Sequence, residues 1–199
     1  MKIPNQTTSC RNTGLRASAS AFTLIELMVV IAIILVLATM TVGGLGWYKR
    51  KAAEGKTTVL VSSIARGLEE YRLDNGFFPH ANGGNGSTEQ VYIALYGDGN
   101  LVIDGTTGNV TIGTGPTGTP DSENKVYLSI LDPDLKGNKL NVDPSTYTIL
   151  DAWGTELQYR SPGEMNPADD FDLWSLGPDG KGGPNTGTEK QRLDDIKNY

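Results

Sequence analysis

The residue in the most unusual setting is Glu26, a carboxylate inside a long apolar segment. It is the only charged residue in the stretch FTLIELMVVIAIILVLATMTVGGLGWY, which occupies positions 22–48. A carboxylate within a lipid bilayer costs about 2.5–3.5 kcal/mol on insertion scales. Such a residue needs a cationic partner, or it must reach the lipid headgroups. The residue types alone leave both explanations open.

The rest of the sequence offers no catalytic set. It contains no nucleophile elbow, no phosphate-binding loop, no HExxH and no Cys/His spacing typical of a metal site. The only histidine, His80, follows a Pro, and the only cysteine, Cys10, lies in a basic N-terminal stretch. A net charge of -6 argues against nucleic-acid binding, which needs a basic surface. An enzyme is therefore not predicted.

The apolar segment at 22–46 is long enough to span a hydrocarbon core of roughly 30 Å. Trp47 and Tyr48 follow it, and then a basic run at 49–51, as at a membrane surface. A cleaved secretory signal peptide does not fit, because the apolar stretch is too long and no A-x-A site follows. A plain signal anchor fits the length but gives no reason for Glu26.

The stretch AFTLIEL, from Ala21 to Leu27, resembles the processing site of type IV pilins and type II secretion pseudopilins. In that family a prepilin peptidase removes a basic leader and methylates the new amine. The resemblance implies a leader at 1–21 and a cut between Ala21 and Phe22, although the family usually has Gly where this chain has Ala21. The Phe22 ammonium of one subunit would then pair with Glu26 of its neighbour, which implies that Glu26 directs assembly.

The helical pattern continues beyond the apolar segment. Leu60, Ile64, Leu68 and Tyr71 recur at helical spacing and predict one buried stripe. Asn75-Gly76 is a typical helix end, so we expect one helix over 24–74. Glycines at 43, 44 and 46 interrupt it and favour either a bend or close packing against another helix.

The region at 76–146 contains weaker signals, and its glycine-rich part at 81–125 has no recognised motif. The apolar segment 91–96 predicts a short helical turn, and 125–131 another short element. Two short apolar runs, 101–103 and 110–112, predict a β-hairpin. Nearer the C-terminus, 155–160 and 171–177 alternate between apolar and polar residues, which is typical of half-buried strands. Packed on the helical stripe, these strands predict an α+β fold.

The C-terminal segment carries a second resemblance. The stretches DAWG at 151–154, QYRSPGE at 158–164, FDLWSLGPDG at 171–180 and DDIKNY at 194–199 resemble the major pseudopilin of type II secretion. That family has a structural calcium in the loop after the second strand. Carried over, the ligands would be the Leu176 carbonyl and the carboxylates of Asp179, Asp194 and Asp195. Calcium takes six to eight oxygen ligands, so these types are suitable; a solvated acidic loop is the alternative.

These resemblances imply the main shaft subunit of a type II secretion pseudopilus, a homopolymer that drives protein export across the outer membrane. We expect it to cross the inner membrane once, with its C-terminal domain in the periplasm, and then to enter the filament. Expected partners are prepilin peptidase, the inner-membrane assembly platform and the minor pseudopilins, but no nucleic acid. A type IV pilus subunit and a membrane-anchored binding module that never polymerises are alternatives. The predicted segments are 1–21 (leader), 22–46 (membrane and assembly helix), 47–75 (amphipathic helix), 76–146 (variable region) and 147–199 (hairpin and calcium loop).

Overall fold

A computed structural model describes the following residues of the chain: 22–79, 88–103, 110–135, 141–166, 170–183 and 187–198. Within these, the side chains of 42–45 are not described. The chain divides into two compact units between Leu45 and Gly46, inside the glycine-containing segment. The predicted leader, Ala21 and His80 lie outside the described residues.

Helix α1, Leu24–Asn75, is the longest element and includes residues of both units. The prediction of one helix over 24–74 is therefore confirmed. It carries a segment long and apolar enough to cross a membrane, judged by length and composition. The helix ends where Gly76 adopts a φ of 83° and donates its amide to the Arg72 carbonyl at 2.7 Å. This left-handed position favours glycine, which has no Cβ to clash.

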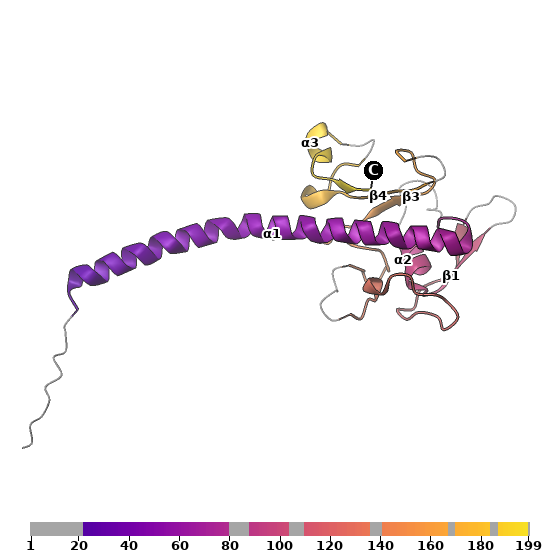
Figure 1. The fold of residues 1–199 in the computed structure, drawn as a ribbon, viewed down its shortest axis with the longest axis horizontal. Coiled ribbons are helices and arrows are strands. Elements are labelled where there is room, and N and C mark those ends of the chain that lie inside the picture. The colour runs from indigo at the N-terminus through magenta and orange to yellow at the C-terminus, as the bar shows by residue number, and fades with distance from the viewer. Residues whose placement is uncertain are drawn as a thin grey trace, which may run out of the picture. The chain divides into compact units, whose positions relative to one another are not determined.

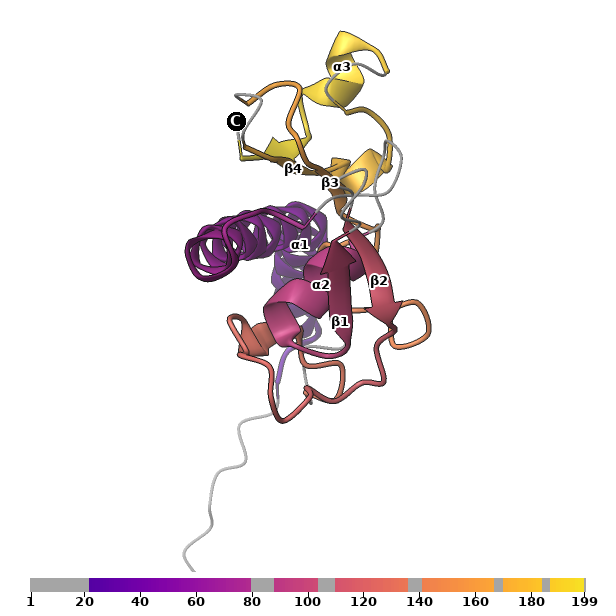
Figure 2. The same ribbon diagram turned by 90° about the vertical axis from the view of Figure 1, so that its right-hand side faces the viewer.

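The core of the second unit forms around the predicted stripe of α1. Leu60, Ile64 and Leu68 are all buried there. Helix α2, Glu89–Tyr96, packs beside them and buries seven of its residues, which confirms the predicted short helix. Figures 1 and 2 show α2 on one side of α1 and strands β3 and β4 on another. The stripe is thus covered from two directions by the rest of its own unit.

Five short strands form two antiparallel sheets. They are β1 (Asn100–Ile103), β2 (Val110–Thr114), β3 (Gln158–Arg160), β4 (Asp172–Ser175) and β5 (Ile196–Lys197). In the first sheet Ile103 pairs with Val110, so the predicted hairpin is confirmed. The second sheet has the order β3-β4-β5. The predicted α+β class, a long helix with small antiparallel sheets, is confirmed.

The C-terminal strands differ from the prediction in length and in burial: β3 covers 158–160 of the expected 155–160, and β4 covers 172–175 of the expected 171–177. Residues 171–177 were expected to alternate, but every residue of β4 is buried. Strand β4 is central, because β3 and β5 pair with its two edges. Two of its polar side chains are hydrogen-bonded inside: Asp172 Oδ2 accepts from the Glu164 amide, and the Ser175 hydroxyl donates to Asp151 Oδ2 at 2.7 Å. The two-residue β5 was missed because so short a segment shows no period.

Candidate functional site

Glu26 lies in the first turn of α1, three residues after Thr23. The Thr23 amide and hydroxyl donate to Glu26 Oε2 at 3.0 and 2.8 Å, and the Glu26 amide donates to the Thr23 hydroxyl at 3.3 Å. This reciprocal pair is a capping box, in which each residue satisfies a free amide at the helix start. Sequence reasoning missed this role, although the signal, Thr-Leu-Ile-Glu, was present at 23–26.

The capping box leaves Glu26 able to bind a cation as well. Both bonds from Thr23 go to Oε2, and a carboxylate has lone pairs on two oxygens. Phe22, which the sequence predicts as the new N-terminus, is exposed just before the helix. Ala21, on the other side of the predicted cut, is not among the described residues. Glu26 can therefore fix the start of its own helix and still present a carboxylate oxygen to another subunit.

The first unit exposes an apolar surface along α1. Every residue described there, from Phe22 to Thr41, is exposed. Its large apolar side chains, each about half exposed or more, are those of Phe22, Leu24, Ile25, Leu27, Met28, Val29, Val30, Ile31, Ile33, Ile34, Leu35, Val36, Leu37 and Met40. A contiguous apolar surface of this kind marks contact with a membrane or with other proteins. The surface that surrounds Glu26 therefore needs partners outside the chain.

The second candidate site is the loop after β4. Leu176 directly precedes a single 3₁₀ turn, Gly177–Asp179. Asp179 Oδ1 accepts from the Lys181 amide at 2.8 Å, and Asp195 Oδ2 accepts from the Gly183 amide at 3.0 Å. The predicted ligands thus belong to two chain segments, and the bond between Gly183 and Asp195 joins them.

Glycines allow these two segments to approach closely. Gly177 has a φ of 66°, and a Cβ at this position would collide with the carbonyl oxygen of Asp194. Gly182 has a φ of 126°, and its Cβ would lie 2.7 Å from Asp195 Oδ1. Both the left-handed backbone and the lack of space therefore require glycine. The glycine content of this loop is explained by its contact with 194–195.

The carboxylates of the loop are not all satisfied. Asp194 Oδ1 and Asp195 Oδ1 are buried and have no hydrogen-bond partner. Burial raises the pKa of Asp195, and the nearby charges of Asp194 and Asp179 add to this rise. The Gly183 amide and the charge of Lys197 act in the opposite direction. The charges of Asp194 and Asp179 thus both act on Asp195, and two carboxylate oxygens of this loop lack donors.

The loop provides oxygen donors of the types that bind a cation, but these donors do not converge on one position. Within the described parts of the chain, no three acidic, histidine or cysteine side chains already converge as metal ligands do. The Arg50 guanidinium lies near Asp194, with its Nη2 3.9 Å from Asp194 Oδ2. Closing the predicted ligand set would require these carboxylates to turn toward one another.

Other buried acids differ from those of the loop because amides surround them. Asp172 accepts from the amides of Glu164, Met165 and Asn166 at 2.7 to 2.9 Å. Asp98 Oδ2 likewise accepts from the Tyr92 hydroxyl at 3.0 Å and from the Gly118 amide at 2.7 Å. Sequence reasoning did not single out these acids. Because their oxygens already have donors, they hold loops in place and do not resemble a metal site.

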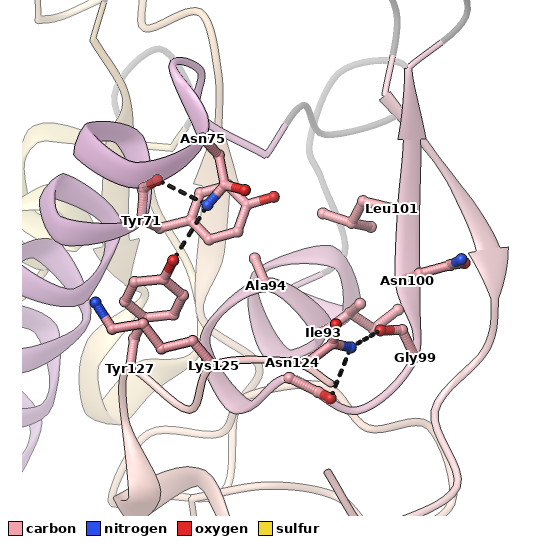
Figure 3. A pocket seen from close by; sticks show the side chains of 11 residues that line it. Tyr71, Asn75, Ile93, Ala94, Gly99, Asn100, Leu101, Asn124, Lys125 and Tyr127 are labelled. Atoms are coloured by element: carbon pink, nitrogen blue, oxygen red, sulfur yellow. Dashed lines mark hydrogen bonds between the residues drawn. The ribbon is translucent and has the colours of Figure 1, made fainter. Parts of the chain in front are cut away.

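A cavity of about 190 Å³ lies between the end of α1 and the start of β1 (Figure 3). Its polar groups bind one another. Asn75 Nδ2 donates to the Tyr127 hydroxyl at 3.2 Å, and Lys125 Nζ lies 2.7 Å from Asp74 Oδ2. None of the predicted site residues lines it. This cavity belongs to the packing of the second unit and not to the predicted sites.

Comparison with known families assigns both ends of the chain. A family model for the prokaryotic N-terminal methylation motif matches residues 16–42, and one for type II secretion system protein G matches 120–198. The type II secretion system core protein G of Pseudomonas aeruginosa is 34% identical over 171 residues, which are 84% of this chain and 89% of that protein. The chain belongs to the core protein G family. The predicted resemblance is thus confirmed.

Other members of the core protein G family match over similar lengths. That of Pectobacterium carotovorum is 34% identical and covers 89% of this chain and 83% of that protein. That of Vibrio cholerae is 30% identical and covers 85% and 88%. A crystal structure of the major pseudopilin from the type 2 secretion system of enterohaemorrhagic Escherichia coli has 26% identity and a TM-score of 0.39, and covers 78% of this chain and 93% of that one. The family consists of structural subunits.

Proposed function

We propose that this pseudopilin is cut between Ala21 and Phe22, held in the inner membrane by residues 22–46 with its second unit in the periplasm, and then assembled into the type II secretion pseudopilus. The observation that carries this proposal is the exposed apolar surface of the first unit, from Phe22 to Met40. Lipid covers that surface before assembly, and helices of other copies cover it afterwards. The subunit therefore moves from one apolar partner to another.

Within the filament, the Phe22 ammonium of one subunit pairs with Glu26 of the next. Two opposite charges at the edge of an apolar layer offset the desolvation of each other. The exposed position of Phe22 and the free lone pairs of Glu26 support this pairing. The pair would set the axial register between subunits. A homopolymer built in this way also needs the peptidase, the membrane assembly platform and the minor pseudopilins as partners.

The decisive test separates the two roles of Glu26. A Glu26→Gln variant keeps the capping box, because Gln also accepts at this position, but it removes the charge. We expect filaments to be absent when this variant is overproduced, with leader cleavage and membrane insertion unchanged. Thr23→Ala is the matched control, since it weakens the cap and keeps the charge. Normal filaments from Glu26→Gln, with loss in Thr23→Ala, would show that Glu26 acts only as a cap.

We propose further that calcium binds in the C-terminal loop. The donors would be the carboxylates of Asp179, Asp194 and Asp195 and the carbonyl of Leu176. Two buried carboxylate oxygens without donors, and a pKa of Asp195 raised by burial and by its acidic neighbours, support the binding of a cation here. Bound calcium would neutralise the repulsion and clip residues 176–183 to 194–195.

A type IV pilus subunit is the second candidate for the function. It shares the exposed apolar helix and the methylation motif. Its subunits commonly close a C-terminal loop with a disulfide, whereas residues 22–199 of this chain contain no cysteine. Loss of secretion, with twitching and DNA uptake unchanged, in a strain lacking this chain would favour the secretion pseudopilus.

A further inference from the structure

A buried chain of hydrogen bonds ends at the loop proposed to bind calcium. It begins at Asp151, whose Oδ1 accepts from the amides of Trp153 and Thr155, both at 2.9 Å. Asp151 Oδ2 accepts from the Ser175 hydroxyl at 2.7 Å, and the Ser175 oxygen accepts from the Gly177 amide at 3.0 Å. Asp151, Ser175 and Gly177 are all buried. The chain therefore runs through groups that water does not reach.

The start of this chain is anchored on the second part of α1. The buried Thr57 hydroxyl accepts from the Ala152 amide at 3.2 Å. The Asp151 amide donates to the Thr155 carbonyl at 2.8 Å, which closes the turn around the carboxylate. Asp151 is thus held by the helix and by its own turn, so the hydroxyl that binds it is also held in place.

The last bond of the chain fixes the direction of the Leu176 carbonyl. A peptide unit is planar and trans, so its C=O and N–H point in opposite directions. The Leu176 carbonyl and the Gly177 amide belong to the same unit. Because this amide is held toward Ser175, the Leu176 carbonyl is held on the opposite side. Leu176 supplies the backbone oxygen of the proposed ligand set.

The same peptide unit lies against the other segment that carries proposed ligands. A Cβ added to Gly177 would collide with the Asp194 carbonyl oxygen and would lie 3.3 Å from Asp194 Cγ. The chain also begins at a carboxylate, and hydrogen bonds in a chain polarise one another. Electron density on the Leu176 carbonyl oxygen therefore rises when the Gly177 amide is bound, which makes this oxygen a better ligand for a cation.

We propose that Asp151 and Ser175 are positioning residues of the calcium loop, which fix the direction and the charge of the Leu176 carbonyl without contacting the ion. This inference rests on the proposed calcium site and adds residues that are not among its ligands. If the hydrogen-bond chain only held the turn, its loss would lower the stability of the second unit and leave the affinity for calcium unchanged.

The first test measures calcium binding to the full-length chain in detergent by titration calorimetry. Ser175→Ala breaks the chain and should weaken calcium binding about 10–100-fold, as the loss of groups that orient metal ligands typically does. Ser175→Thr keeps the hydroxyl and should restore most of the affinity. Tyr92→Phe is the matched control, because the Tyr92 hydroxyl also donates to a buried carboxylate, that of Asp98, at 3.0 Å. It should lose stability and keep its affinity for calcium.

The second test needs no substitution and observes the carbonyl directly by NMR. Leucine labelled with carbonyl ¹³C and glycine labelled with ¹⁵N select the Leu-Gly peptide bonds, which occur in this sequence at 45–46 and 176–177. Calcium should shift the Leu176 carbonyl resonance, while the Gly177 amide stays protected from exchange with solvent. The Leu45 carbonyl is the internal control and should not shift. In Ser175→Ala at saturating calcium, the shift at Leu176 should be smaller.

The outcomes separate the calcium site from its positioning residues. If the unmodified protein binds no calcium, the proposed site is wrong and this inference fails with it. If calcium binds but Ser175→Ala binds it as tightly, or if Tyr92→Phe loses as much affinity, the positioning role alone is overturned. If Ser175→Ala does not fold, the labelled unmodified protein still decides. A Leu176 carbonyl that does not shift, or a Gly177 amide that exchanges freely, overturns the proposal.

Discussion

The two parts of α1 belong to one helix but satisfy their apolar residues in opposite ways. From Phe22 to Met40 the apolar side chains are exposed on every face. From Leu60 to Tyr71 they form one stripe, and the second unit buries it. The chain itself therefore buries the apolar residues of only the second part of this helix. Lipid or further subunits must cover those of the first part, so the first part serves assembly and the second part serves folding.

The largest expected effect comes from placing charge in the first part of α1. Ile33→Asp with Val36→Asp should abolish membrane insertion, because two acids at the centre of a span cost about 5–7 kcal/mol together. The melting temperature of the second unit should not change, since no core residue lies there. Carbonate extraction and a thermal melt in detergent measure the two results.

The matched control for this prediction is Val59→Asp, at an exposed position in the second part of α1. We expect normal insertion and a normal melt. If the variant with Ile33→Asp and Val36→Asp remained in the membrane fraction, this would contradict the division of roles between the two parts of the helix.

The next effect concerns the buried stripe. Leu68→Ala should destabilise the second unit, produced alone as residues 46–199, by about 2–5 kcal/mol because it leaves a cavity in the core. Leu73→Ala, at an exposed position of the same helix, should change the stability by no more than about 0.5 kcal/mol. Urea denaturation followed by circular dichroism measures both. Similar values for the two variants would contradict the packing described for this stripe.

The next prediction concerns the proposed binding of calcium by the second unit. At a concentration of about 100 times the dissociation constant, calcium should raise the melting temperature of residues 46–199 by about 5–10 °C. Asp195→Asn should lose this rise. In chelator, Asp195→Asn should melt at or above the temperature of the unmodified protein, because it removes a buried charge that Asp194 and Asp179 repel.

The exposed Asp134→Asn serves as the control for the calcium prediction, and it should respond to calcium as the unmodified protein does. If calcium raises the melting temperature of neither protein, the proposed calcium site is wrong. An equal rise in Asp195→Asn would show that calcium binds through other ligands.

The smallest effect concerns the exposed end of α1. Hydrogen bonds from Lys125 and Tyr127 hold the pKa of Asp74 below its usual range. Such a carboxylate adds stability above its unfolded pKa of about 3.9, and this contribution is lost as the pH falls through the lower folded pKa. Lys125→Met should therefore raise the pKa of Asp74 in an NMR titration. Asp143, whose pKa is lowered by Ser145, should not move.

The long elements could be predicted from the sequence, because their signals repeat over many residues. The stripe of Leu60, Ile64 and Leu68 predicted both the helix and its buried face. The hairpin at 101–103 and 110–112 was also found, since two short apolar runs flank a glycine-containing turn. The burial of β4 on all its residues was not predicted, because the pairing with β5 depends on a two-residue segment from a distant part of the chain.

The candidate sites were predicted unequally. Glu26 could be found because a charge in an apolar segment is conspicuous. Its capping partner Thr23 was not predicted, because the charge of Glu26 indicated a cationic partner outside the helix. The closeness of 177–183 to 194–195 was predicted from a resemblance and not from residue spacing.

The capping box at Thr23 and Glu26 also concerns proteolysis. Peptide bonds inside a helix are poor substrates, because a protease must bind an extended chain before it can cut. Thr23 marks the last non-helical residue, so α1 begins at Leu24 and Phe22 stays outside it. The same two side chains that start α1 thereby keep Phe22, the residue that would follow the proposed cut, outside the helix.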